Sequence, residues 1–360
     1  MSDADLAPVR RIHIQLRRGM VTVTPAADDR LAWSASPDRV DGDVQGDRLD
    51  LTCRERVEVR LTVRIPGPGL EMLHVDVGSG QVLLEGIGAR VEANVGNGRF
   101  RAERVTGSVN VDIGRGDVLV DGLEGALDVD AGLGSVQVVG VHGALSIDAG
   151  VGSVHVLDSD GNADIDSGTG SVTLVRMAGS AEIDSGMGSV TVESPRRLTL
   201  GVDSGMGSLR IQGGVLEKLT AELGRGSLAV HQSRILGAHC ELETGSAQLL
   251  LDGRQPGRLE AVAYRGRVVS SLPRVSVPFA GAPRSGERAV LQFADGGPLL
   301  YVQTRRGSIT VERGRTLDDD MEQQVDRERE QRLILEELQA GRITPDAARR
   351  LLEALQNRRS

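Results

Sequence analysis

The sequence predicts an all-β solenoid, or β-helix, with irregular β caps and a small C-terminal α-helical hairpin. Three observations predict it. A Gly-x-Gly motif recurs every 18 or 19 residues through the middle of the chain. Short segments of alternating apolar and polar residues flank each motif, as strands with one buried face require. Near the C-terminus this alternation gives way to leucines at helical spacing.

The repeat can be aligned by the first glycine of each motif. Six steps of 18 residues and then two of 19 separate Gly78, Gly96, Gly114, Gly132, Gly150, Gly168, Gly186, Gly205 and Gly224. Glu243 takes this position one step later, with Gly245 keeping the second glycine, which makes about ten rungs. A second set is expected to close the other corner of each rung: Gly107, Gly125, Gly143, Gly161 and Gly179.

Each 18–19-residue rung is predicted to hold two short strands. In the rung around Gly132, Leu127 and Val129 alternate with aspartates before the corner, and Val136 and Val138 alternate with polar residues after it. An antiparallel meander would use similar strands. Stacking like residues on like, about 4.8 Å apart, explains the constant period better. We therefore expect a solenoid with a flat aliphatic core.

The chain divides into four predicted parts. Residues 1–66 contain irregular strand-like segments and Trp33, and we expect an N-terminal β cap there, because an uncovered edge strand invites aggregation. Residues 67–251 hold the solenoid repeats. Residues 252–315 are expected to form C-terminal strands and a second cap, including a rung-like stretch around Gly307. Residues 316–360 comprise an acidic linker and the helical hairpin.

The predicted hairpin has capping signals at suitable places. Gly341 can end the first helix, Thr344 can cap the second, and Pro345 suits its first turn. About 30 residues cannot bury two apolar helix faces alone. We expect the hairpin to pair with its own copies, giving a homo-oligomer, or to bind another protein, through Leu338, Leu351, Leu352 and Leu355.

The composition argues against several classes of protein. One Trp, two Tyr and three Phe against 47 Gly indicate a thin aliphatic core. A net charge of −9 disfavours binding to nucleic acid. The start lacks an apolar signal and no segment suits an integral membrane span, so we expect a cytoplasmic protein. Cys53 and Cys240 are expected to be reduced, structural thiols, and no cofactor is indicated.

An acidic residue stands two positions before the first corner glycine on almost every rung. The set, called here the acidic ladder, comprises Asp76, Asn94, Asp112, Asp130, Asp148, Asp166, Asp184, Asp203, Glu222 and Glu241. Neighbouring charges would repel by about 0.9 kcal/mol in water and about 3.5 kcal/mol at a dielectric constant of 20. Asx-type turns at the corners could offset this repulsion. So could Ca²⁺ or other cations at Asp130, Asp148, Asp166 and Asp184, or a basic partner.

Other motifs give weaker signals. A serine follows each corner, as at Ser135 and Ser153, but no histidine accompanies the row in register, which argues against nucleophilic catalysis. The six histidines are scattered and show no metal-ligand spacing. The glycine motifs lack the following helix that a nucleotide site needs. An apolar column at the corner tips could face outward as a lateral contact strip or fold over the end of the core: Leu133, Val151, Met187 and Met206.

Two stretches carry a resemblance to a known family. "VRIPGPGLEMLHVDVGSGQVLLEGIGARVEANVGNG", the rungs after it and "TRRGSITVE" resemble the bacterial putative-adhesin family of β-strand-repeat proteins, mostly of unknown function. "ILEELQAGRITPDAARRLLEAL" is similar to the SHOCT-like helical hairpin that accompanies many of them. The resemblance implies a β-helical, non-enzymatic protein, in some relatives linked to envelope stress or surface attachment, with a hairpin that mediates oligomerisation.

These observations favour a non-enzymatic structural or scaffold protein that self-associates. The alternative is a module that binds cations or a basic partner through the acidic ladder. A third hypothesis is a carbohydrate-active β-helix enzyme that takes two carboxylates from the acidic face. The shortage of aromatic residues and of long loops on one side argues against this third hypothesis.

Overall fold

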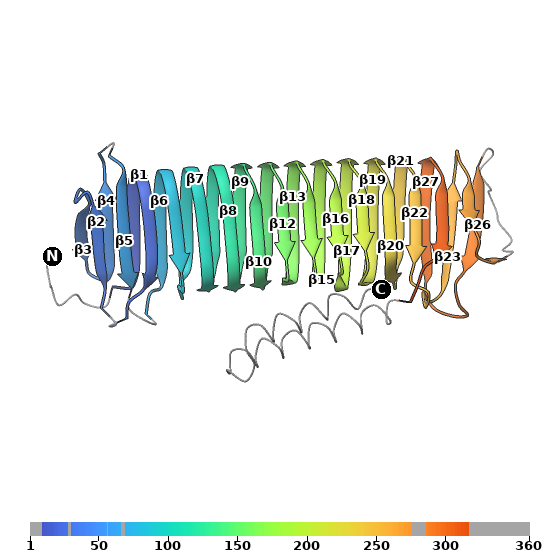
Figure 1. The fold of residues 1–360 in the computed structure, drawn as a ribbon, viewed down its shortest axis with the longest axis horizontal. Coiled ribbons are helices and arrows are strands. Elements are labelled where there is room, and N and C mark those ends of the chain that lie inside the picture. The colour runs from blue at the N-terminus through green and yellow to red at the C-terminus, as the bar shows by residue number, and fades with distance from the viewer. Residues whose placement is uncertain (1–8, 28–29, 56, 66–68, 276–285, 317–360) are drawn as a thin grey trace, which may run out of the picture.

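The computed structural model describes residues 9–27, 30–55, 57–65, 69–275 and 286–316. These residues form 28 strands of one sheet, which winds into a long rod (Figure 1). Most neighbouring strands are parallel and join equivalent positions of successive rungs. The predicted β-solenoid is therefore confirmed. The predicted helical hairpin lies outside the described residues.

The regular rungs occupy the middle of the rod. In the first three, the strands before and after the corner run on as one: β6 (Met72–Glu85), β7 (Arg90–Thr106) and β8 (Val109–Glu124). The next rungs are pairs: β9 (Leu127–Leu133) with β10 (Val136–His142), β11 (Leu145–Val151) with β12 (Val154–Leu157), β13 (Asp160–Thr169) with β14 (Val172–Val175), and β15 (Ala178–Met187) with β16 (Val190–Glu193). The last regular pairs are β17 (Arg196–Met206) with β18 (Leu209–Gln212), β19 (Val215–Arg225) with β20 (Leu228–Ile235), and β21 (Ala238–Thr244) with β22 (Ala247–Leu251).

Local bulges absorb the extra residue of the 19-residue steps. Arg196 pairs with Ala178 and Leu198 with Gly179, so Arg197 is the inserted residue, at a left-handed φ of 55°. The pairing of β17 with β19 shifts register in the same region. The first corner therefore stays aligned through these rungs.

The N-terminal end of the rod folds back on itself. β1 (Arg11–Pro25) pairs with β6 on one side and, on the other, with a rung made of β4 (Arg48–Cys53) and β5 (Val59–Ile65). β3 (Asp41–Gln45) and β2 (Ala32–Ser36) then pair antiparallel with β4 and β5. These antiparallel strands cover the outer edge, which would otherwise present unpaired backbone groups.

The C-terminal end has the same arrangement in reverse. β27 (Leu299–Arg306) and β28 (Ile309–Arg313) form a rung that stacks directly on β21 and β22. β23 (Arg258–Ala263) and β24 (Val268–Ser270) lie outside that rung although they precede it in sequence. β26 (Glu287–Gln292) and β25 (Arg274–Val275) complete the end with antiparallel pairing. The stretch around Gly307 is therefore a rung, as its sequence suggested, but it is not the outermost one.

The core between the two faces is aliphatic. The column Val136, Val154, Val172 and Val190 is at most 1% exposed, and Phe100 is the largest fully buried side chain. Burying one aliphatic side chain stabilises by roughly 1.5–3 kcal/mol, and here each side chain is buried only when neighbouring rungs cover it. The stability of a rung thus depends on the rungs stacked against it.

Two glycine columns allow the first corners to stack. A Cβ on Gly170 would lie 1.6 Å from the carbonyl oxygen of Gly152, and one on Gly168 would lie 2.7 Å from that of Gly150. The same approach recurs along the rod because each corner backbone passes directly over the one before it. Glycine is required for this close contact as well as for the backbone conformation.

The second corner contains a feature that the glycine pattern did not predict. Gly125 and Gly143 approach the backbone of the preceding rung closely, as expected. The left-handed residue that turns the chain stands three positions earlier: it is Gly140 in one rung, but Asp158 and Arg176 in the next two, with φ of 62°, 51° and 52°. This left-handed position therefore accepts side chains.

Three serines interrupt the aliphatic core near the first corner. Ser167, Ser185 and Ser204 stack in register, are at most 2% exposed, and their hydroxyl groups have no hydrogen-bond partner. Ala131 and Ala149 hold the same column in earlier rungs. A buried hydroxyl without a partner lowers stability relative to alanine.

Candidate functional site

The acidic ladder runs along the outside of the strands that precede the first corner. Asp130, Asp148, Asp166 and Asp184 lie on β9, β11, β13 and β15, directly opposite one another in register. Their side chains are exposed. The structure thus places these four residues one strand spacing apart, about 4.8 Å.

The charges of the ladder act on one another. Burial and the carboxylates of Asp112 and Asp148 raise the pKa of Asp130 above its usual value. Burial and the carboxylates of Asp148 and Asp184 do the same for the pKa of Asp166. Ionisation of these two groups therefore costs more free energy in the folded chain than in a free aspartate.

The expected Asx-type turns are not what offsets this repulsion. In the rungs that the structure describes, no corner N–H donates to a carboxylate of the ladder; hydrogen bonds to it come from side chains, such as the one that Asn94 Nδ2 donates to Asp76 Oδ1 at 2.7 Å. The side chain two residues before a corner points straight out from the strand, away from the turn. The middle of the ladder is a row of carboxylates facing solvent.

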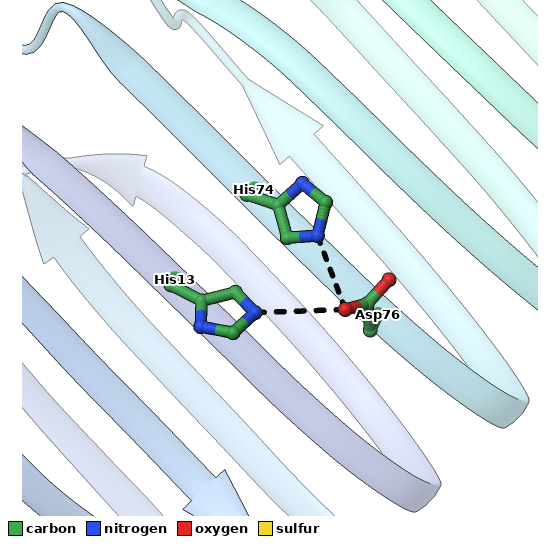
Figure 2. A group of neighbouring side chains, drawn as sticks. All are labelled: His13, His74 and Asp76. Carbon is green, nitrogen blue, oxygen red and sulfur yellow. Dashed lines mark hydrogen bonds and ion pairs between the residues drawn. The ribbon is translucent and has the colours of Figure 1, made fainter.

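At its N-terminal end the acidic face carries a cluster that the sequence did not predict. His13 on β1 and His74 on β6 are register neighbours, and Asp76 follows two residues later on the same face of β6. Figure 2 shows the three side chains pointing toward one another. Asp76 Oδ2 lies 3.1 Å from His74 Nε2 and 3.5 Å from His13 Nε2, and the two imidazole rings are 4.9 Å apart. The three side chains are 24–30% exposed.

Carboxylates also face the other nitrogen of each imidazole. Asp50 Oδ1 lies 3.0 Å from His13 Nδ1, and Glu92 Oε2 lies 3.5 Å from His74 Nδ1. Arg48 donates to Asp50 at 2.7 Å. Together these side chains form one polar network across β4, β1, β6 and β7.

This network keeps its central carboxylates ionised. Burial works to raise the pKa of Asp76, but the hydrogen bond from Asn94 and the adjacent His74 outweigh it and hold that pKa below its usual value. Burial likewise works to raise the pKa of Asp50, which the hydrogen bonds from Arg48 and His13 lower.

The apolar column at the corner tips faces outward. Leu133, Val151, Met187 and Met206 are 42–49% exposed, and their positions pair in register along the first corner, with Thr169 between the second and third. The side chains therefore point to solvent and do not fold over the end of the core. We call these four residues the corner strip. Arg115 precedes it in the same column and Arg225 follows it.

The other candidates from the sequence are the serine row, the two cysteines and the hairpin leucines. Ser135 of the serine row donates its hydroxyl hydrogen to Asp117 at 3.1 Å, not to a histidine. Cys53 and Cys240 are buried free thiols, as expected. Leu338, Leu351, Leu352 and Leu355 lie outside the described residues. Among the described residues, no helix is long and apolar enough to cross a membrane.

The histidine cluster was missed because its ligands come from two strands that are distant in sequence. A signal was present: "IHIQL" at Ile12 and "LHVDV" at Leu73 have the same alternation with histidine at the same place. Aligning the N-terminal segment as a rung would have paired His13 with His74. The N-terminal segment has Gly19 but no Gly-x-Gly motif, so the glycine period did not include it.

Two solved structures and one family model match this chain. A crystal structure of a putative adhesin from Bacteroides fragilis NCTC 9343 is 11% identical over 86% of this chain and 94% of its own, with a TM-score of 0.23. One of a putative cell adhesion protein from Clostridium sporogenes ATCC 15579 is 8% identical over 86% of this chain and 97% of its own, with a TM-score of 0.17. No curated protein matches the chain. The sequence model of one family matches residues 9–274, and the chain therefore belongs to the Toastrack DUF4097 family.

Proposed function

We propose that this protein is a non-catalytic scaffold that self-associates, with the corner strip as its lateral contact between copies. The observation that carries the proposal is the exposure of Leu133, Val151, Met187 and Met206 in a single line along the rod. Isolated exposed apolar residues are ordinary, but an aligned row of them on a rigid edge is typical of an interaction surface.

The geometry of the corner favours a second copy as the partner. Each strip residue lies between the two glycines of its Gly-x-Gly motif, and glycine has no side chain. The apolar side chains therefore project from the corner without neighbouring side chains that would block a partner. Two rods in antiparallel contact would bring each strip against the other, with Arg115 and Arg225 at the two ends of the contact. The hairpin residues Leu338 and Leu351 supply a second contact in this proposal.

Light scattering across a concentration series tests the proposal. We expect the full chain to be oligomeric. The double variant Met187→Gln/Met206→Gln should associate more weakly, so that it dissociates at a higher protein concentration than the unmodified chain. The matched control is Val269→Gln, because Val269 is 54% exposed but lies on β24, away from the corner. Comparing the full chain with a chain that ends at Arg315 shows how much the hairpin contributes to self-association. A full chain that stays monomeric at all concentrations would contradict self-association.

A second candidate function rests on a different observation. The pKa of Asp130 and of Asp166 is raised by burial and by neighbouring aspartates, so a bound cation or a basic partner would relieve repulsion that the fold leaves in place. A Ca²⁺ titration of the melting temperature tests it, since a ligand that binds only the folded chain raises that temperature. The shift should be absent in Asp148→Asn/Asp166→Asn. An equal shift in this variant would contradict the hypothesis.

A further inference from the structure

We propose that His13, His74 and Asp76 form a binding site for a divalent transition-metal ion of the Zn²⁺ class. The inference is independent of self-association and of the exposed aspartates in the middle of the rod. It rests on the ligand atoms, on the groups behind them, and on the strands that hold them.

The ligand atoms have the separation that a metal requires. Zn²⁺ binds imidazole nitrogen and carboxylate oxygen at about 2.0–2.2 Å, so two ligands at a tetrahedral angle lie about 3.3 Å apart. Asp76 Oδ2 is 3.1 Å from His74 Nε2 and 3.5 Å from His13 Nε2. One ligand atom from each of the three residues lies within 4.8 Å of the others. Small side-chain rotations are enough to close this set around one ion.

The chemistry of the set selects the class of ion. Two imidazoles and one carboxylate are the donors that Zn²⁺ and neighbouring transition metals prefer, whereas Ca²⁺ and Mg²⁺ prefer oxygen alone. The side chains are 24–30% exposed, so solvent reaches the site and can supply the remaining ligand positions. The ladder aspartates farther along the rod offer oxygen only and do not compete for the same ion.

Each imidazole has a carboxylate behind it that favours the metal-binding tautomer. A proton on His13 Nδ1 can be donated to Asp50 at 3.0 Å, and one on His74 Nδ1 faces Glu92 at 3.5 Å. Both Nε2 atoms are then left with a free lone pair. Arg48 holds Asp50 in this position, donating to Asp50 Oδ1 from Nε at 2.9 Å and from Nη2 at 2.7 Å. Carboxylates in this position orient metal-bound histidines in many proteins and raise their basicity.

The charge balance also suits a cation. The carboxylates of Asp50, Asp76 and Glu92 surround the two imidazoles, and the nearby guanidinium groups are those of Arg48 and Arg90. Both guanidinium groups are engaged by the carboxylates behind the rings rather than by Asp76. Asp76 therefore keeps its negative charge at the centre, with Oδ1 bonded by Asn94 and Oδ2 facing the two imidazoles.

The backbone holds the ligands on a rigid surface. β1 is paired along both edges, and β6 is paired with β1 and with β7, so neither strand is at a free edge. A metal bound here joins β1 to β6, between which β2, β3, β4 and β5 stand in the sequence. We therefore expect metal binding to stabilise this end of the rod.

Calorimetric titration of the EDTA-treated full chain with Zn²⁺ tests the proposal. We expect one ion per chain, and we expect His13→Gln and His74→Gln each to weaken binding by at least tenfold. Asp50→Asn should weaken it by about tenfold, the lower end of the range for groups behind a ligand. The matched control is His142→Gln, because His142 pairs with Asp160 at 2.9 Å and its register neighbours are the acidic residues Glu124 and Asp160. This control should bind Zn²⁺ like the unmodified chain.

Three results would overturn the site, and the first two do not depend on what the variants do to folding. The first is a full chain that binds no stoichiometric Zn²⁺ at micromolar concentration. The second is a Co²⁺ complex whose visible spectrum is that of the hydrated ion. Melting curves recorded in EDTA show whether each variant is folded. Equal loss of binding in His142→Gln and in His74→Gln would also contradict it.

Discussion

Replacing Gly170 by alanine tests whether close backbone contact at the first corner, rather than turn geometry, requires the repeating glycines. Its φ is 153°, and an added Cβ would lie 1.6 Å from the carbonyl oxygen of Gly152. The obstructing atom is backbone and cannot rotate away. Corner hydrogen bonds hold both rungs: Gly152 N donates to Thr169 O and Gly170 N to Met187 O, each at 2.9 Å. Losing two such bonds at about 1 kcal/mol each and straining the backbone by about 1–3 kcal/mol gives an expected cost of about 3–5 kcal/mol.

The matched control for this substitution is Gly140→Ala at the second corner. Gly140 has a left-handed φ of 62°, but the nearest atom to an added Cβ is 3.9 Å away. Asp158 and Arg176 hold the same position in later rungs, so we expect a cost of only about 1 kcal/mol. Urea unfolding followed by circular dichroism measures both changes, and hydrogen exchange shows whether protection is lost locally around residues 150–190. Equal effects of the two substitutions would refute the argument from backbone contact.

Four further predictions concern single side chains. Ser185→Ala should stabilise the chain by about 1 kcal/mol, because the buried hydroxyl of Ser185 has no hydrogen-bond partner. Thr304→Val should destabilise the chain by about 1 kcal/mol, because the Thr304 hydroxyl donates to Gly245 O at 2.9 Å. Urea unfolding measures both changes, and a loss of stability in Ser185→Ala would contradict the first prediction. Asp166 has a raised pKa in the folded chain, from burial and neighbouring aspartates, so its ionised form opposes folding above that pKa and the opposition disappears as the pH falls through it. Asp166→Asn should therefore raise the melting temperature at pH 7 and have little effect at pH 3, and a uniform shift at both would contradict this. Burial raises the pKa of Cys240 to about 12, so iodoacetamide at pH 8 should label it only as the chain opens; rapid labelling of the native protein would show that the thiol is accessible.

The repeat could be predicted from the sequence because stacked rungs require the same residue type at equivalent positions, which produces a constant spacing. Each first-corner glycine contacts the glycine one rung away, so both positions must be glycine and the 18-residue period is visible. The two ends could not be placed in the same way. β1 lies between two rungs, and β27 lies inside β23, because of long-range pairing that no local pattern specifies.

The two surfaces differ in how much of them the sequence revealed. The positions of Asp148 and Met187 each recur at the repeat period, so the residues of the acidic ladder and of the corner strip could be predicted from the sequence. Which way the strip pointed could not, because a corner residue can turn in or out. His13 and His74 meet only through the insertion of β1, so the metal cluster required the pairing order itself.

The way β1 and β28 are inserted determines how the rod would respond to tension. In the described chain, the polypeptide enters at β1 and leaves after β28, and other rungs lie beyond each of them. A pull on the chain at these points would act along the rod (Figure 1), in the direction of the hydrogen bonds between rungs, and would have to separate β1 from strands on both of its edges. The tips of the rod would carry none of this force directly, because other rungs lie beyond both points of attachment.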